Sequence, residues 1–450
     1  MTTRILTILS FITFCSFLKN EPGLKCHKTF TSDQLKADFL LLTTKLQDIH
    51  PDLYRVTPKR LIDKRISDIQ GSIKSPKTYL EFLKLLAPLF TDIGDISTQW
   101  GHSPEYIKFR NENIPMFPFQ LKIQGSKFYI QSNYSNDASI LPESEILKIN
   151  GETVTDYLKK NYSLLPTDGK IISIQQRWLE TYFPQHHSNF WAQPDTFKLE
   201  LKDKVGKIYT KSVSALLKKQ IQTKKTSSNT ASPSLQFYIS DNTGVLTIPS
   251  FKGSKLEPFV DSCFTVLQTQ KIKNLILDLK GEGSGNFYFG SVLYSYLKQS
   301  PSKYVEQIHI KGDTSFKYTD PSASYENIEK LSTQLTEVTQ PKKNSFNGNL
   351  YVITDGWTIN SKGFFCAKVQ ERPNTFFAGE ECGSSTFGTN EFPISLTLPN
   401  TGLQIYIPTV QIEINRTKNH SSITGVRVNY PIKDVENDKV IKQTLKLVTK

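Results

Sequence analysis

The stretch Leu275-Ile-Leu-Asp-Leu-Lys-Gly-Glu-Gly-Ser-Gly-Asn286 decides how this chain of 450 residues folds. It joins a continuous apolar run, which is typical of a strand buried on both faces, to a turn with glycine at 281, 283 and 285. Strands and helices alternate in this way from Val245 onward. We therefore expect helices packed on a mainly parallel sheet, as in an α/β core.

A second turn, Thr358-Ile-Asn-Ser361, follows the predicted strand Leu350–Ile353 and opens a helix. Ligands bind past the carboxyl ends of the strands in such sheets, where both turns stand. A serine at a helix start lies in a field that favours negative charge, and glycine-loop amides complete an oxyanion hole. Together the turns indicate acyl transfer by a serine. Taken singly, the serine is a helix cap and the glycines a tight connection.

The part of the chain before this core is predicted to form two further units. Apolar residues at steps of three and four predict helices over 32–49, 62–73 and 77–90. Residues 117–132 and 140–155 alternate as strands do, with a turn at Asn150-Gly151, in an order that resembles a PDZ domain. The predicted divisions are a signal peptide at 1–17, a helical domain at 31–113, a PDZ-like domain at 116–217, a polar linker at 218–234 and the core at 235–450.

The first residues predict export. Arg4 precedes an apolar run from Ile5 to Phe17, which is shorter than the roughly 20 residues of a membrane-spanning helix and fits a signal peptide. Cleavage after Cys15 or lipid attachment at Cys15 are the two alternatives. No later segment is apolar enough to span a membrane. We expect a periplasmic, secreted or lipid-anchored protein.

Composition excludes several classes of function. The 55 Lys and Arg against 42 Asp and Glu give a net charge of +13, but the lysines are scattered, which argues against a nucleic-acid partner. The five cysteines show no Cys-x-x-Cys spacing and the histidines no His-x-x-x-His pair. We therefore expect no metal and no cofactor. Cys263 and Cys366 fall on apolar helix faces, where a small buried residue is expected.

The order of these motifs resembles the tail-specific, or C-terminal processing, serine peptidase family, whose cores are related to the tricorn protease. His50-Pro51 resembles the end of the family's opening helix, and Gly94-Asp95 its Gly-Asp-Gly-His-Thr turn. Residues 275–286 resemble its glycine loop, and Gly379-Glu380 the pair that follows its nucleophile helix. The resemblance implies a helical cap, a PDZ-like domain, a peptidase core and a polypeptide substrate.

The resemblance also implies roles for single residues. Ser361, in Asn360-Ser361-Lys362-Gly363, corresponds to the nucleophile, with oxyanion donors at Lys362 and at Gly283 or Ser284. The catalytic base departs from the family. The lysine of the Ser-Lys branch is replaced by Thr389, and the histidine of the tricorn-like branch by Ser97, which leaves His102 as a substitute base, with Lys362, Lys280 and Glu380 as further alternatives.

Two functions follow, and a third has less support. The first is a serine peptidase that cleaves exported or unfolded polypeptides through Ser361, with turnover reduced or lost because a missing base costs about 10²- to 10⁴-fold. The second is an inactive relative that binds peptides or serves as a scaffold. The third is a polysaccharide-binding or adhesion module, supported only by 11% aromatic residues and export. The oligomeric state is left open.

Overall fold

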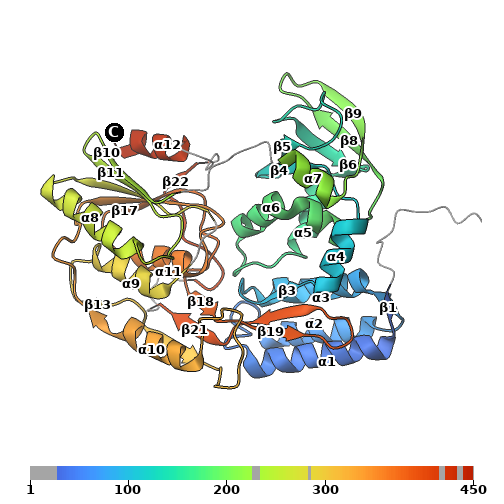
Figure 1. Ribbon diagram of the computed structural model, residues 1–450, viewed down its shortest axis with the longest axis horizontal. Coiled ribbons are helices and arrows are strands. Elements are labelled where there is room, and N and C mark those ends of the chain that lie inside the picture. The colour runs from blue at the N-terminus through green and yellow to red at the C-terminus, as the bar shows by residue number, and fades with distance from the viewer. Residues whose placement is uncertain (1–27, 226–233, 282–284, 415–420, 433–438, 449–450) are drawn as a thin grey trace, which may run out of the picture.

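The computed structural model describes residues 28–225, 234–281, 285–414, 421–432 and 439–448. Three units are visible in Figure 1: a base of helices from the first hundred residues, a β-rich unit above it, and an α/β core beside both. This confirms the predicted α/β architecture. The predicted signal peptide lies outside the described residues.

The helical unit forms because apolar residues recur on one face of each helix. In α1 (Ser32–Ile49) this face is fully buried, and Thr31 closes the start of the helix with a capping box. The other elements are β1 (Thr29–Phe30), α2 (Lys59–Ser72), β2 (Lys77–Thr78), α3 (Tyr79–Ile93), β3 (Gln99–Gly101) and α4 (Pro104–Asn113). The three helices predicted here are α1, α2 and α3.

The middle unit is an antiparallel sheet in the order β4-β5-β6-β8-β9, with β7 beside β6. Asn150 and Gly151 have φ values of 52° and 87°, as the predicted turn requires. Its elements are β4 (Phe119–Gln124), β5 (Lys127–Asn133), β6 (Glu145–Ile149), β7 (Glu152–Thr153), α5 (Val154–Tyr162), α6 (Ile172–Phe190), β8 (Thr196–Lys202), β9 (Ile208–Ser214) and α7 (Lys218–Lys225). Residues 218–225 of the predicted linker are thus helical.

The core is a six-stranded sheet in the order β10-β11-β12-β16-β17-β22, parallel except for β10. Its strands are β10 (Gln236–Ser240), β11 (Thr243–Thr247), β12 (Asn274–Asp278), β16 (Asn349–Thr354), β17 (Thr375–Gly379) and β22 (Tyr430–Pro431). One face packs on α8 (Leu256–Thr269), α9 (Phe287–Ser295) and α11 (Asn360–Val369), the other on α12 (Lys439–Val448). Cys263 and Cys366 are buried in this core, as predicted.

Two predicted core strands lie elsewhere. Residues 394–398 and 403–407 belong to the predicted core, 235–450, but β19 (Ile394–Thr397) pairs with β20 (Gln404–Ile407), and β20 pairs with β3 of the helical unit. Figure 1 shows them crossing toward α1. In β20 only alternate residues are fully buried, as in an antiparallel sheet with one covered face, whereas core strands are buried on both.

The remaining elements connect these units. They are β13 (Ser302–Lys303), β14 (Gln307–Ile310), α10 (Tyr325–Thr336), β15 (Val338–Thr339), β18 (Gly388–Glu391) and β21 (Val410–Glu413), of which β14, β21 and β18 form a sheet. The polar segment 301–348 packs on the core through Ile328 and Leu335 of α10. Among the described helices, none combines the length and the apolar character needed to span a membrane.

Candidate active site

The two predicted turns lie at the same edge of the core sheet. Strands β12 and β16 are parallel neighbours, with Asp278 paired to Ile353, so both end at this edge. The amide of Gly281 donates to both carboxylate oxygens of Asp355, at 3.0 Å each. The turn after β12 is therefore fastened to the turn after β16.

Ser361, the predicted nucleophile, lies behind this edge. Its side chain is 0% exposed, and its hydroxyl accepts a hydrogen bond of 2.8 Å from the amide of Gly285. A side chain at Gly285 would come within 2.6 Å of the backbone of Phe251, so only glycine brings its amide this close. Within the described residues, the Ser361 hydroxyl has no hydrogen bond to an imidazole, an amine or a carboxylate. Gly283 and Ser284, the predicted oxyanion donors, lie outside the described residues.

Lys362 is also buried, and its side chain is hydrogen-bonded to the glycine turn. Its ammonium donates to the carbonyl oxygens of Pro249 at 3.0 Å and Gly281 at 2.9 Å. Burial lowers the pKa of Lys362 from its ordinary value, although the carboxylates of Asp355 and Asp278 act in the opposite direction. The amine is held by carbonyl groups, so its role here is to hold the turn.

Asn360, the neighbour of the predicted nucleophile, has an unusual backbone conformation. It is the first residue of α11 and has a φ of 51°, in the left-handed region that non-glycine residues rarely adopt. Its amide donates to the hydroxyl of Ser384 at 2.9 Å. A strained turn between a buried strand and a helix is the form of a nucleophile elbow, which presents its central side chain to the substrate. Here that side chain is a carboxamide.

A cavity of about 930 Å³ opens beside the elbow. Asn360, Gly285, Phe251 and Glu391 contribute to its lining, whereas Ser361 does not. The side-chain oxygen of Asn360 is buried and has no hydrogen-bond partner among the described residues. A ligand in this cavity would thus meet Asn360 before it met Ser361.

Comparison with known proteins identifies the core. Residues 242–432 match the model of peptidase family S41. The core of this chain belongs to that family. No curated protein matches the sequence.

Solved structures share its architecture. One described as mature CPAF is 12% identical, with a TM-score of 0.62 over 93% of this chain and 96% of that chain. Mature CPAF complexed with lactacystin is 11% identical, with a TM-score of 0.61 over 93% and 97%. The photosystem II D1 C-terminal processing protease is 11% identical, with a TM-score of 0.41 over 90% and 93%. At this identity the likeness to CPAF establishes a shared fold.

The turn that resembles the histidine turn of the family holds Ser97 in a buried polar network. His50 accepts from the amide of Asp52 at 3.0 Å through Nδ1, which leaves Nε2 to donate to Asp95 at 2.9 Å. Burial alone would raise the pKa of Asp95, but the hydrogen bond from His50 and the nearby positive charges outweigh it, so the pKa is lowered. The amide of Ser97 donates to the other oxygen of Asp95 at 3.1 Å. These hydrogen bonds fix the backbone of the turn, but the side chain at position 97 is a hydroxyl instead of an imidazole.

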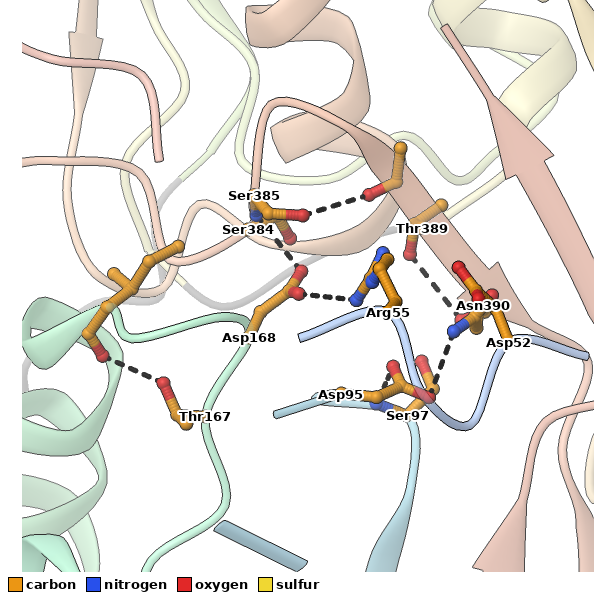
Figure 2. Close-up of polar contacts among 12 residues, drawn as sticks. Asp52, Arg55, Asp95, Ser97, Thr167, Asp168, Ser384, Ser385, Thr389 and Asn390 are labelled. Atoms are coloured by element: carbon orange, nitrogen blue, oxygen red, sulfur yellow. Dashed lines mark hydrogen bonds and ion pairs between the residues drawn. The ribbon is translucent and has the colours of Figure 1, made fainter. Parts of the chain in front are cut away.

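This network joins the three units, as Figure 2 shows. Arg55 donates to Asp168 at 2.8 Å, and Asp168 accepts from the amide of Ser385 in the core at 3.0 Å. Asn390 of β18 donates to Asp95 at 3.2 Å. Burial raises the pKa of Asp168 to about 6 despite the Arg55 charge. The network therefore connects the helical unit, the segment before α6 and the core.

His102 lies away from the elbow. Its ring packs among the rings of Tyr79, Trp100 and Tyr106 in tilted and edge-on contacts, and its Nε2 atom lies 3.0 Å from the Asn189 amide nitrogen. Burial and, to a smaller extent, the Arg110 charge lower its pKa to about 3. All these contacts belong to the helical unit and α6, so His102 does not have the position expected of a substitute base.

Glu380, an alternative base, and Thr389, at the position of the lost lysine, are both engaged in other contacts. Glu380 is bound by the guanidinium of Arg177, whose Nε donates at 3.0 Å, and burial raises the pKa of Glu380. Thr389, in the place of the lysine of the Ser-Lys branch, donates to the carboxylate of Glu391 at 2.9 Å. Sequence analysis missed Asn360 and Glu391. Asn360 had one signal, because asparagine tolerates the left-handed conformation better than most residues.

Proposed function

We propose that this chain is a polypeptide-binding member of family S41 that does not hydrolyse its ligand. The observation that carries the proposal is the side chain at the elbow. Asn360 is the residue with a φ of 51° that borders the cavity, and its carboxamide nitrogen has no free lone pair for attack on a carbonyl. Ser361, the adjacent hydroxyl, is buried.

The absence of a base supports the same conclusion. A serine hydroxyl is a weak nucleophile unless a neighbouring group takes its proton. Among the described residues, Ser97 stands in the turn that resembles the family's histidine turn, and His102 lies in the aromatic cluster of the helical unit. Loss of the nucleophile and the base together leaves no route to an acyl intermediate.

Ligand binding is supported by what remains. The cavity of about 930 Å³ lies within the range of functional binding sites. An extended polypeptide can add to a sheet edge and bind mainly through its backbone. We also propose that the chain works outside the cytoplasm, because the apolar run Ile5–Phe17 fits a signal peptide.

The second candidate function is slow peptide hydrolysis through Ser361. It is favoured by the hydrogen bond between Gly285 and Ser361, which keeps an amide donor beside a serine at a helix start. Catalysis would require Ser361 to turn into the cavity and to find a base.

Labelling with a fluorescent fluorophosphonate separates the two functions. We expect no labelling of the wild-type chain and none of the Ser361→Ala variant, while both bind denatured, fluorescently labelled casein equally well. Labelling that disappears in Ser361→Ala would establish hydrolysis and overturn the proposal. Absence of both labelling and casein binding would contradict polypeptide binding itself.

A further inference from the structure

We infer that the cavity beside Asn360 selects polypeptide segments in which a Lys or Arg lies next to a large apolar residue. This inference rests on the proposed polypeptide binding and adds the chemical class of the ligand. It is drawn from the lining of the cavity and from the way its charges are paired.

The apolar part of the preference comes from the walls. Their apolar side chains include Phe251, Phe287, Phe289 and Ile328, all less than 10% exposed, together with the partly exposed Phe392. A volume of about 930 Å³ holds several side chains of a peptide. Burial of one large apolar side chain against these rings contributes about 1.5–3 kcal/mol.

The basic part of the preference comes from unbalanced charge. Glu257, Asp320 and Glu391 line the cavity, and Lys252 is the basic residue among its described lining residues, so the lining is negative once the pH exceeds the Glu391 pKa of about 8. The whole chain carries a net charge of +13, so a negative lining differs from the rest of the molecule. A cationic ligand is therefore attracted to the cavity more than to the surrounding surface.

Two of these carboxylates already have positive neighbours. Lys342 Nζ lies 3.8 Å from Glu257, and the charge of Lys252 acts on Asp320. Both carboxylates belong to exposed residues, where ion pairs contribute little. They do not distinguish one ligand from another.

Glu391 differs because it is partly buried beside the elbow and has no cationic partner among the described residues. One of its carboxylate oxygens accepts from Thr389 at 2.9 Å, and the structure gives the other no hydrogen bond within the described residues. Burial raises the pKa of Glu391 to about 8, and Asp95 and Asp168 add to this effect. A guanidinium or ammonium group from a ligand would supply the missing counter-charge, and charge-assisted hydrogen bonds of this kind are strong.

The test uses fluorescence anisotropy with three labelled nine-residue peptides. The first contains Phe-Arg at its centre, the second Phe-Gln and the third Ala-Arg. At pH 8.5 we expect the first peptide to bind the wild-type chain roughly 10-fold more tightly than either of the others, as one charge-assisted contact or one buried ring would give.

Two variants test whether Glu391 causes the preference for Phe-Arg over Phe-Gln. Glu391→Gln should reduce the Phe-Arg over Phe-Gln ratio to near 1. Glu145→Gln, a matched change at a carboxylate outside the cavity that is paired with Lys127 at 3.1 Å, should leave the ratio unchanged. Equal thermal unfolding midpoints at pH 5, where Glu391 is protonated, would show that the Glu391→Gln variant is folded. Binding of all three peptides with equal affinity, or a ratio that persists in Glu391→Gln, would overturn the inference and leave the proposed function standing. Failure of every peptide and of denatured casein to bind would instead reject the proposed function.

Discussion

The start of α11 and the turn at residues 94–98 are two regions of one site, and they differ in how their polar groups are satisfied. At α11, Asn360 borders the cavity and its side-chain oxygen is buried without a partner among the described residues. At the turn, the two oxygens of Asp95 accept from Ser97, Thr98, His50 and Asn390. The elbow thus has a strained backbone beside the cavity, whereas the hydrogen bonds of the turn connect the helical unit to the core. This difference is consistent with the proposed binding of a ligand at the elbow.

Restoring both reactive groups should give the largest effect. Ser97 is partly exposed and its hydroxyl has no hydrogen bond among the described residues, so Ser97→His leaves the network of Asp95 intact. We expect the double variant Ser97→His with Asn360→Ser to react with a fluorophosphonate about 10²- to 10⁴-fold faster than Asn360→Ser alone, because a positioned base gives such factors.

The control repeats this experiment in a Ser361→Ala background. Labelling should persist there, because the reactive hydroxyl is then at position 360. A folded double variant that does not react would show that the two turns do not approach each other as an active site requires. The elbow and the turn at residues 94–98 would then not belong to one site.

The polar network that connects the units can be disrupted by a substitution at Asp168. Arg55 is 3% exposed at its side chain, and Asp168→Ala leaves its guanidinium buried without a counter-ion. We expect the free energy of unfolding to fall by about 3–5 kcal/mol at pH 7.5, measured by urea denaturation. Asp63→Ala, which removes an exposed ion pair with Lys59, is the matched control and should change it by at most about 1 kcal/mol. Equal losses in both variants would mean that the network does not hold the units together.

A smaller effect depends on pH. The pKa of Glu391 is raised from 4.5 to about 8 in the folded chain by burial, with Asp95 and Asp168 adding to the rise and Thr389 opposing it. The contribution of Glu391 to stability is therefore fully present below pH 4.5 and is lost as the pH rises through 8. Glu391→Gln should match the wild type near pH 4.5 and exceed it by about 1–2 kcal/mol at pH 9.

Thermal unfolding midpoints between pH 4.5 and 9 measure this difference. Asp168, with a pKa of about 6, changes the stability in the same direction in both proteins, and its repulsion with Glu391 is part of the difference that the comparison measures. A wild-type chain that stays as stable as Glu391→Gln at pH 9 would show that the carboxylate is already paired or hydrated.

Local sequence patterns were sufficient for the elements of the core. The apolar run after Asn274 and the periodic face of 32–49 predicted β12 and α1 with nearly the observed bounds. A helix or strand that is buried on one face or on both has a characteristic spacing of apolar residues, which is visible in the sequence of that segment alone. The same patterns could not show that β20 pairs with β3, because pairing between residues as distant in sequence as Gln404 and Gly101 depends on the tertiary fold.

The residue that borders the cavity, Asn360, is the neighbour of the predicted nucleophile, Ser361, and the reason for this difference is geometric. The sequence Asn360-Ser361-Lys362 placed the site at the start of α11, but residue type alone directed attention to the hydroxyl. Which of two neighbours faces the cavity depends on a single φ value. Glu391 carried no local signal, since its environment is formed by Asp95 and Asp168 from two other units.

The smallest effect separates backbone strain from the buried oxygen at Asn360. A left-handed φ costs alanine roughly 1 kcal/mol relative to glycine, so Asn360→Ala should be less stable than Asn360→Gly by that amount in thermal unfolding. Asn242, with a φ of 58° in the exposed turn between β10 and β11, is the matched control and should show the same difference between alanine and glycine. Only at position 360 should glycine also exceed asparagine, because it removes an acceptor that is buried without a partner among the described residues. If the wild-type protein were instead more stable than the Asn360→Gly variant, the side-chain oxygen of Asn360 would already have a hydrogen-bond partner. The elbow would then not differ from the turn at residues 94–98 in this respect.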